Sequence, residues 1–206
     1  MIENKIYIVF RGSESKYDWY YNFHIKKKKL NNNIYVHLGY YNVLMADNTY
    51  HIIKEIIIEL IRKKNNAKHD FEICLTGHSA GSSVSSLCTF LLSKELPNYK
   101  FSNYTFGCPR IGNYDFIESF ESSNCICWNI VNNKDIVSRI PSIGYYNMKN
   151  IIYLDTKSKT AKFKNNKPNK NWLYNILNNL FDLLYNFSIF DHKMSSYITN
   201  LNKFYL

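Results

Sequence analysis

The feature of this sequence that most constrains its fold is a series of short, continuously apolar runs separated by helical patterns. The runs are rich in β-branched and aromatic residues, which is typical of strands buried on both faces of a parallel sheet. Between them, the apolar residues of segment 52–61 recur on one helical face, and a second helical pattern follows Gly81 and ends before Pro97. Strands that alternate with helices predict an α/β fold, with a mostly parallel sheet and helices on both of its faces. The apolar runs are residues 6–10, 71–75, 104–106, 126–131 and 151–154.

Length and composition indicate one globular domain. The chain has 206 residues, of which 46% are apolar and 20% charged, so it can bury a sizeable core. The N-terminal segment has an acidic residue before its apolar run and no small-residue cleavage site, and no apolar run is long enough to span a bilayer. We therefore expect a single domain over residues 1–206, located in the cytoplasm, with no signal peptide and no transmembrane segment.

The formal net charge of +10 would favour anionic partners. The lysines of segments 26–29 and 157–170 lie in polar stretches that predict solvated loops, and the stretch 156–170 is the best candidate for a mobile loop. No RNA-binding motif or recognition-helix pattern accompanies the charge, so we do not expect nucleic-acid binding. The five cysteines are an odd set that fits buried free thiols in a reducing compartment, and Cys125 and Cys127 have no partner pair at zinc-site spacing, so we predict no metal site.

A Gly-x-Ser-x-Gly motif lies between a predicted strand and a predicted helix. Residues 71–75 run into Gly77, Ser79 and Gly81, and the helical pattern follows at once. This context is what a nucleophile elbow requires, because the turn is too tight for side chains at the two glycine positions and holds the serine above the sheet. The N-terminus of the following helix would favour negative charge that develops beside the serine. Ser79 is therefore a candidate nucleophile.

A serine nucleophile needs a base, and the base needs an acid that orients it. In folds with this elbow the chain order is serine, then acid, then histidine. Only His192 lies C-terminal to Ser79, so the order selects it. The other five histidines precede Ser79: His24, His37, His51, His69 and His78.

Two aspartates compete for the role of the acid. Asp135 follows the strand predicted at 126–131 after a short polar turn, at the sheet edge where active sites of such sheets lie. Asp155 follows the strand predicted at 151–154, and Asp191, next to His192, is expected to fix the local loop. We favour Asp135 over Asp155. Two further aspartates fall in helical patterns and are discounted: Asp115 and Asp182.

The sequence resembles the class 3 lipase family, also called the fungal triacylglycerol lipase-like family. Six blocks match in order, beginning at residue 8 and ending with Tyr197: IVFRGSES, VHLGYYNVL, ICLTGHSAGSS, YTFGCPRIGN, IVNNKDIVSRIP and DHKMSSY. The resemblance implies an α/β-hydrolase fold, an esterase that acts on lipids, and a catalytic triad of Ser79, Asp135 and His192. It thereby selects Asp135 over Asp155.

The resemblance also suggests residues around the triad. It implies an oxyanion hole made by the amides of Ser13 and Ala80, although from the sequence alone Ser13 would be a simple turn residue. Segment 15–23 matches the position of a short helical lid over the acyl pocket, with the alternative of a fixed aromatic loop. The lid and acyl-pocket candidates are Tyr17, Trp19 and Tyr20.

The chain departs from the family pattern in three places. The family's second glycine after the elbow is Ser82 here, and the lid segment ends in Asn22 where an aspartate is usual. Relatives carry substantial sequence before the block that contains Arg11 and Gly12, whereas this chain has only a few residues there. We therefore expect an N-terminally reduced fold in which one sheet edge is exposed or covered differently.

Together these features predict a serine ester hydrolase that acts on lipid carboxylic esters through an acyl-enzyme intermediate and without a cofactor. The alternative is a catalytically inactive lipid-binding or membrane-binding module on a reduced hydrolase fold. Segment 171–190 has the pattern of an amphipathic helix with a wide apolar face, and we favour docking on the core over contact with a membrane. Peripheral contact with a lipid surface remains a further hypothesis. The oligomeric state and the identity of the lipid ester stay open.

Overall fold

The computed structural model describes residues 5–12, 26–31, 33–63, 71–158, 160–165 and 188–203. Six strands form one sheet in the order β1-β4-β5-β6-β7-β8. Neighbouring strands from β1 to β7 are parallel, and β8 pairs antiparallel with β7. All five apolar runs form strands, so the prediction of a mostly parallel sheet is confirmed. The strands are β1 (Lys5–Phe10), β4 (Glu72–His78), β5 (Lys100–Phe106), β6 (Cys125–Asn132), β7 (Asn150–Asp155) and β8 (Thr160–Asn165).

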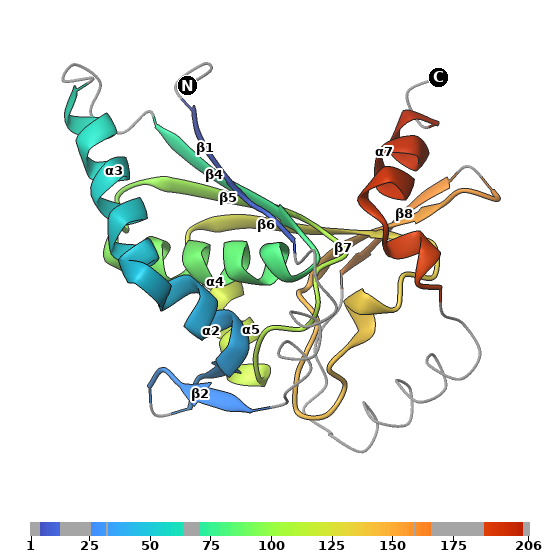
Figure 1. Cartoon of the computed structure of the whole chain (residues 1–206), viewed down its shortest axis with the longest axis horizontal. Helices are drawn as coiled ribbons and strands as arrows, with labels where there is room; N and C mark the ends of the chain where they lie inside the picture. Colours follow the sequence, from blue (N-terminus) through green and yellow to red (C-terminus); the bar gives the residue numbers. More distant parts are fainter. Residues whose placement is uncertain are drawn as a thin grey trace.

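Helices cover both faces of this sheet, as predicted (Figure 1). Helix α4 crosses one face, with α2, α3 and α5 on the same side, whereas α7 lies on the opposite face near β6. Short 3₁₀ turns η1 and η2 follow α2 and β6, and η3 precedes α7. The helical segments are α2 (Leu38–Met45), η1 (Ala46–Asn48), α3 (Thr49–Lys63), α4 (Ala80–Glu95), α5 (Tyr114–Glu121), η2 (Val137–Arg139), η3 (Phe190–His192) and α7 (Met194–Asn202).

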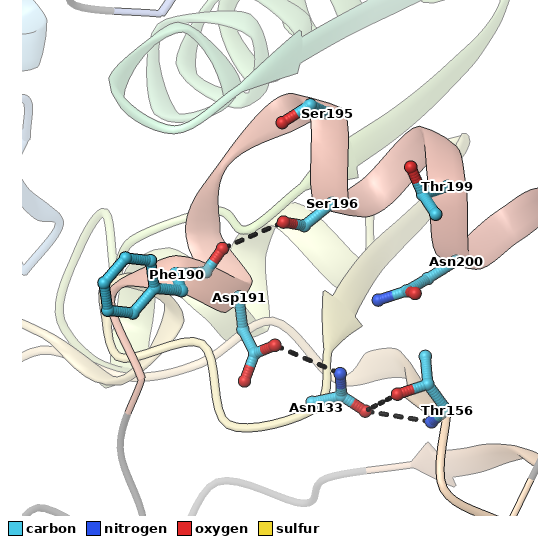
Figure 2. Close-up of a pocket in the computed structure, with 8 residues that line it drawn as sticks. All are labelled: Asn133, Thr156, Phe190, Asp191, Ser195, Ser196, Thr199 and Asn200. Carbon is cyan, nitrogen blue, oxygen red and sulfur yellow. Dashed lines mark hydrogen bonds between the residues drawn. The ribbon is translucent and has the colours of Figure 1, made fainter.

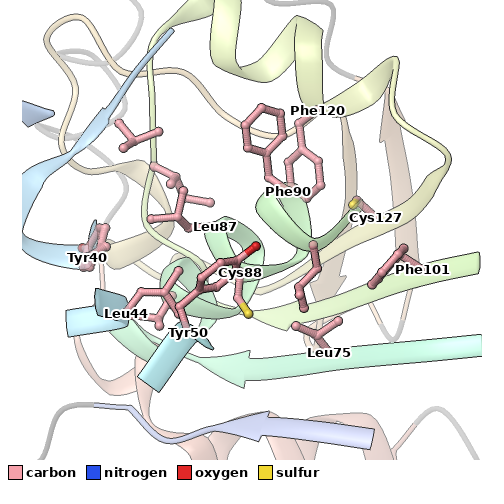
Figure 3. Packing of buried hydrophobic residues seen from close by; sticks show 14 of the residues in the cluster. Tyr40, Leu44, Tyr50, Leu75, Leu87, Cys88, Phe90, Phe101, Phe120 and Cys127 are labelled. Carbon is pink, nitrogen blue, oxygen red and sulfur yellow. The ribbon is translucent and has the colours of Figure 1, made fainter. Parts of the chain in front are cut away.

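The main hydrophobic core lies between the sheet and α4 (Figure 3). Leu75 of β4 and Phe101 of β5 meet Leu87 and Phe90 of α4, and α2, α3 and α5 close the outer side. Most of α4 is buried, and its sequence is rich in serine. Small serine side chains allow close packing against the sheet, and their hydroxyls are hydrogen-bonded, as buried polar groups must be.

The opposite face of the sheet is covered unevenly. Ile130 and Leu154 pack beneath Tyr197 of α7 in a second, smaller cluster. Farther along the same face, towards β1, the side chains of Val9 and Tyr104 are exposed. Val9 and Tyr104 both pair with Thr76, and residues paired across parallel strands face the same side, so the three lie in one row on this face, with both apolar side chains exposed among the described residues.

Two segments differ from the sequence-based predictions. Residues 160–165, expected within a mobile loop, form strand β8, whose six residues are all exposed. Part of the lysine run expected in a loop forms the short strand β2 (Lys27–Lys29), which pairs antiparallel with β3 (Tyr35–His37). In both segments, backbone pairing with a neighbouring strand overrides a polar composition that favours loops. The predicted lid segment 15–23 and residues 171–187 of the predicted amphipathic helix lie outside the described residues.

Candidate active site

Ser79 sits in a sharp turn between β4 and α4. Its backbone angles, φ 58° and ψ −133°, lie in a region that residues other than glycine rarely adopt. The two flanking residues must be glycines, because there is no room for a Cβ at either position. A Cβ on Gly77 would lie 2.5 Å from the carbonyl oxygen of Gly81, and a Cβ on Gly81 would overlap the carbonyls of Phe10 and Arg11. The predicted elbow geometry is therefore present.

The structure brings Ser79, His192 and Asp135 together in a chain of hydrogen bonds. Nε2 of His192 lies 2.8 Å from the Ser79 Oγ, and Nδ1 lies 2.8 and 3.0 Å from the two carboxylate oxygens of Asp135. A carboxylate only accepts, so Nδ1 carries the proton and Nε2 is left to accept from the serine hydroxyl. The side chains come from three elements far apart in sequence: the elbow after β4, the turn after β6, and η3.

Burial removes this site from bulk water. Ser79 is 6% exposed, His192 5% and Asp135 0%. A buried carboxylate needs partners for its remaining lone pairs. The backbone N–H of Val137 donates to Oδ1 of Asp135 at 2.8 Å, and the hydroxyl of Tyr197 donates to Oδ2 at 2.6 Å. These donors fix the carboxylate plane that orients the imidazole.

Tyr197 extends the chain of hydrogen bonds by one residue. It is fully buried on α7, and its hydroxyl accepts from the backbone N–H of Asn132 at 3.0 Å while donating to Asp135. Burial and the Asp135 carboxylate raise the pKa of Tyr197 well above its ordinary value, so the hydroxyl remains a donor. Tyr197 thereby links helix α7 to the turn after β6 through Asp135 and Asn132.

Gly107 lies directly against His192 and Asp135. It follows β5 and has a positive φ of 58°. A Cβ at this position would lie 2.5 Å from Oδ2 of Asp135 and 3.0 Å from Nδ1 of His192. Both the backbone conformation and the lack of space require glycine here.

The loop that carries His192 is tied to the turn after β6. Asn132 donates through Nδ2 to the backbone oxygen of Asp191, and Asn133 donates through Nδ2 to the Asp191 carboxylate at 3.1 Å. The expectation that Asp191 fixes the local loop agrees with these contacts. Asn133 and Asp191 also border a polar hollow of about 320 Å³ between this turn, η3 and α7 (Figure 2). Its lining residues are Asn133, Thr156, Phe190, Asp191, Ser195, Ser196, Thr199 and Asn200.

The remaining predicted residues fall into two groups. Ala80 is the first residue of α4, directly after Ser79, where helical amides have no intrahelical acceptor. The competing carboxylate, Asp155, accepts from the amides of its own loop at Lys157 and Ser158. The second group lies outside the described residues: Ser13, Tyr17, Trp19 and Tyr20.

Sequence reasoning missed Tyr197 and Gly107. Both lie within matching sequence blocks, so their block membership was the available signal. Apart from its block, a tyrosine on an amphipathic helix would be predicted to be a core residue. The positive φ of Gly107 is visible only in the structure.

Within the described residues, no group of three His, Cys, Asp or Glu side chains could hold a metal ion. None of the described helices is long and apolar enough to cross a membrane. All five cysteines are free, and four of them are buried.

The parallel sheet, the strained serine between β4 and α4, and the buried histidine and aspartate together define the α/β-hydrolase class. The sequence model of the family "Lipase (class 3)" matches residues 7–145. The chain belongs to this family.

Curated relatives agree with this assignment. A lipase of Rhizomucor miehei is 26% identical over 148 residues, covering 69% of this chain and 39% of that protein. The secreted mono- and diacylglycerol lipase 1 of Fusarium solani is 28% identical over 156 residues, covering 73% and 44%. A phospholipase A1-II 1 of Oryza sativa subsp. indica is 31% identical over 109 residues, covering 50% and 27%. The chain thus spans less than half the length of each of these relatives.

Solved structures share the fold. The Rhizomucor miehei triacylglyceride lipase superposes with a TM-score of 0.71 at 23% identity, covering 92% of this chain and 70% of that one. A lipase from Rhizopus microsporus var. chinensis superposes with a TM-score of 0.68 at 23% identity, covering 93% and 65%. At these identities the likeness concerns the fold alone.

Proposed function

We propose that this chain is a serine ester hydrolase that acts on lipid carboxylic esters, with Ser79 as nucleophile, His192 as base and Asp135 as the acid that orients the base. The observation that carries the proposal is the continuous hydrogen-bonded path from the Ser79 hydroxyl to the buried Asp135 carboxylate. The Ser79 hydroxyl proton would pass to Nε2 of His192 as Oγ attacks the ester carbonyl. Asp135 remains ionised and holds the imidazole in the tautomer that can accept this proton.

The reaction proceeds through an acyl-enzyme. When the tetrahedral intermediate collapses, the bond to the alcohol breaks, and His192 returns its proton to the leaving alkoxide. Water then attacks the Ser79 ester, its proton passes to His192, and collapse releases the fatty acid and regenerates the serine. The strained backbone at Ser79 supports this role because it presents Oγ at the carboxyl edge of the sheet.

We assign the oxyanion hole to the backbone amides of Ala80 and Ser13. Ala80 opens α4 directly after Ser79, so its N–H has no acceptor within the helix, which supports a role for this amide in binding an oxyanion. Gly12, the residue before Ser13, approaches the nucleophile closely, since a Cβ on Gly12 would lie 3.4 Å from that of Ser79. The acyl-pocket and lid roles of Tyr17, Trp19 and Tyr20 rest on the family resemblance.

Membership of the class 3 lipase family supports a lipid ester as the substrate. The relatives named above include a secreted mono- and diacylglycerol lipase and a phospholipase A1. We therefore propose a glycerol-based lipid ester as substrate and leave the headgroup unassigned.

Hydrolysis of short and long acyl esters by the purified chain, beside a Ser79→Ala variant, tests this function. We expect Ser79→Ala to lose about 10⁴-fold or more in kcat, because the triad acts as a unit. Ser119→Ala on α5 is a matched control that removes a hydroxyl far from the site and should retain the wild-type rate.

The outcome of this experiment separates the two candidate functions. Wild-type activity that is lost only in Ser79→Ala, and that rises with acyl length, supports a lipase. Vesicle binding by a folded wild-type chain without hydrolysis would instead favour a catalytically inactive lipid-binding module.

A further inference from the structure

The residue before the nucleophile makes two separate contacts with the base. The ring of His78 stacks on the ring of His192, with centroids 4.7 Å apart and an interplanar angle of 26°. Nε2 of His78 also lies 2.7 Å from the backbone oxygen of His192. A carbonyl oxygen only accepts hydrogen bonds, so Nε2 of His78 is protonated and is the donor in this bond. His78 therefore contacts both the side chain and the backbone of the base.

These contacts join a rigid element to a less constrained one. His78 is the last residue of β4, which is paired on both sides in the sheet, whereas His192 lies in the short turn η3. The other edge of the His78 ring faces the loop after β1, because a Cβ on Gly12 would lie 3.4 Å from its Nδ1. His78 thus bridges the loop after β1 and the loop that carries the base.

The charge state of His78 matters because His192 becomes cationic when it takes the serine proton. Burial lowers the pKa of His78, and the neighbouring His192 lowers it further. A neutral ring can face an imidazolium without repulsion, whereas a cationic ring cannot. Two other titratable groups contact the rings: Asp135 bonds to His192, and Tyr197 of α7 packs against His78. Three more are close in sequence to residues of this contact: Asp191 and Lys193 flank His192, and Arg11 precedes Gly12.

We propose that His78 is a positioning residue, which holds the His192 backbone through its Nε2–H and stacks its ring on the imidazole of the base. This role rests on the proposed hydrolase function. His78 therefore has a role in addition to its place in the turn between Gly77 and Ser79.

Three substitutions separate the contributions of His78. His78→Phe keeps a flat ring and removes the donor, His78→Gln keeps a donor and removes the ring, and His78→Lys keeps a donor but adds a permanent charge. Rates are expressed per active serine, counted by titration with a phosphonate, so that a loss of folded protein does not count as a loss of kcat. The same three changes at His51, which is exposed on α3, are the matched controls.

We expect His78→Phe to lower kcat by about tenfold, the usual cost of one lost hydrogen bond, with little change in KM. His78→Gln should retain more activity than His78→Phe. His78→Lys should lower kcat and move the acid limb of kcat/KM to lower pH, because a fixed cation disfavours the imidazolium. A merely structural role would change the fraction of active protein. It would leave the kcat of the three variants and the acid limb of kcat/KM unchanged.

NMR titration of the His192 ring supplies a readout that does not need turnover. In His78→Lys the ring should titrate at lower pH than in the wild type, while in the His51→Lys control it should not move. If the wild type hydrolyses no ester but this shift appears, the proposed function fails and the positioning contact stands. If the wild type is active, and His78→Phe keeps its kcat while His78→Lys leaves the titration unmoved, the role of His78 is overturned.

Discussion

Asp135 follows β6 and Asp155 ends the neighbouring strand β7, so both lie at the same edge of the sheet, but they differ in burial. Asp135 is fully buried against His192, whereas Asp155 bonds to the amides of its own loop. We expect Asp135→Asn to lower kcat by about 10⁴-fold, because an amide in place of the carboxylate favours the wrong tautomer of the base. Asp155→Asn, the matched control, should keep the wild-type kcat. Equal losses in the two variants would contradict the assignment.

Tyr197 should contribute to both stability and rate. Tyr197→Phe removes a donor to Asp135 and an acceptor for the Asn132 amide, leaving two buried groups without these partners. We expect a loss of about 1–3 kcal/mol in the free energy of unfolding, measured by urea denaturation, together with a lower kcat. A variant as stable as the wild type would show that water or a rearrangement replaces both bonds.

Individual residues were predictable to different degrees. The chain order alone selected His192, because it is the only histidine after Ser79. The choice between Asp135 and Asp155 needed the family resemblance, since both follow predicted strands. The matching blocks contain Tyr197 and Gly107 but do not indicate their roles, because those roles depend on contacts between segments far apart in sequence.

At the scale of elements, the loop after β5 is predicted to tolerate no side chain at Gly107. Gly107→Ala would place a Cβ 2.5 Å from the Asp135 carboxylate and force alanine to a φ of 58°. We expect a loss of about 1–3 kcal/mol in the free energy of unfolding, and a lower kcat as the acid shifts. Gly39→Ala, near the start of α2, is the control and should not reduce stability. A wild-type kcat in Gly107→Ala would contradict this role of Gly107 beside Asp135 and His192.

The turn η3 and the start of α7 form an exposed apolar surface next to the base. Ile189 is 63% exposed and Phe190 75%, and the Nζ of Lys193 lies over the Phe190 ring. The hypothesis of peripheral lipid contact predicts that the double substitution Ile189→Asn and Phe190→Asn weakens binding to anionic vesicles by about tenfold or more in co-sedimentation, because it removes two large apolar side chains from this surface.

The control removes a similar apolar side chain elsewhere. Ile56→Asn changes a half-exposed residue on α3, on the other side of the sheet from α7, and should leave vesicle binding unchanged. Equal binding by the double variant and the wild type would show that this surface does not contact lipid.

Strand β4 was the most predictable, because it is buried along most of its length and its residues 73–75 are continuously apolar. Strand β8 was not, since all of its residues are exposed and its sequence, Thr160–Asn165, carries little apolar pattern. Its backbone pairing with β7 is a tertiary effect that local composition does not encode.

For the whole molecule, the lowered pKa of His78 predicts that the free energy of unfolding depends on pH. Burial lowers its pKa below the ordinary value of 6.5, so the unfolded chain binds this proton more readily than the folded one. The free energy of unfolding should therefore fall as the pH drops from about 7 through the lowered pKa of His78. His78→Gln should flatten this slope in urea denaturation between pH 7.5 and pH 5. An equal slope in both proteins would exclude His78 as its source.

The overall architecture was predictable from the alternation of apolar runs and helical patterns. The uneven cover of the sheet was not. Helix α7 covers β6 and β7 through Tyr197, while Val9 on β1 and Ile126 on β6 remain exposed on the same face. Sequence periodicity indicates which residues are apolar, but it does not indicate which part of a face a distant helix will reach.

The central claim is that Ser79 is an activated nucleophile, and reaction with a fluorophosphonate followed by peptide mass spectrometry tests it most directly. The reagent forms a covalent bond to a serine oxygen only when a base removes its proton. We predict one adduct on the peptide containing Ser79, formed in the wild type and nearly abolished in His192→Ala. Absence of an adduct in folded wild-type protein, or equal labelling in His192→Ala, would contradict the account.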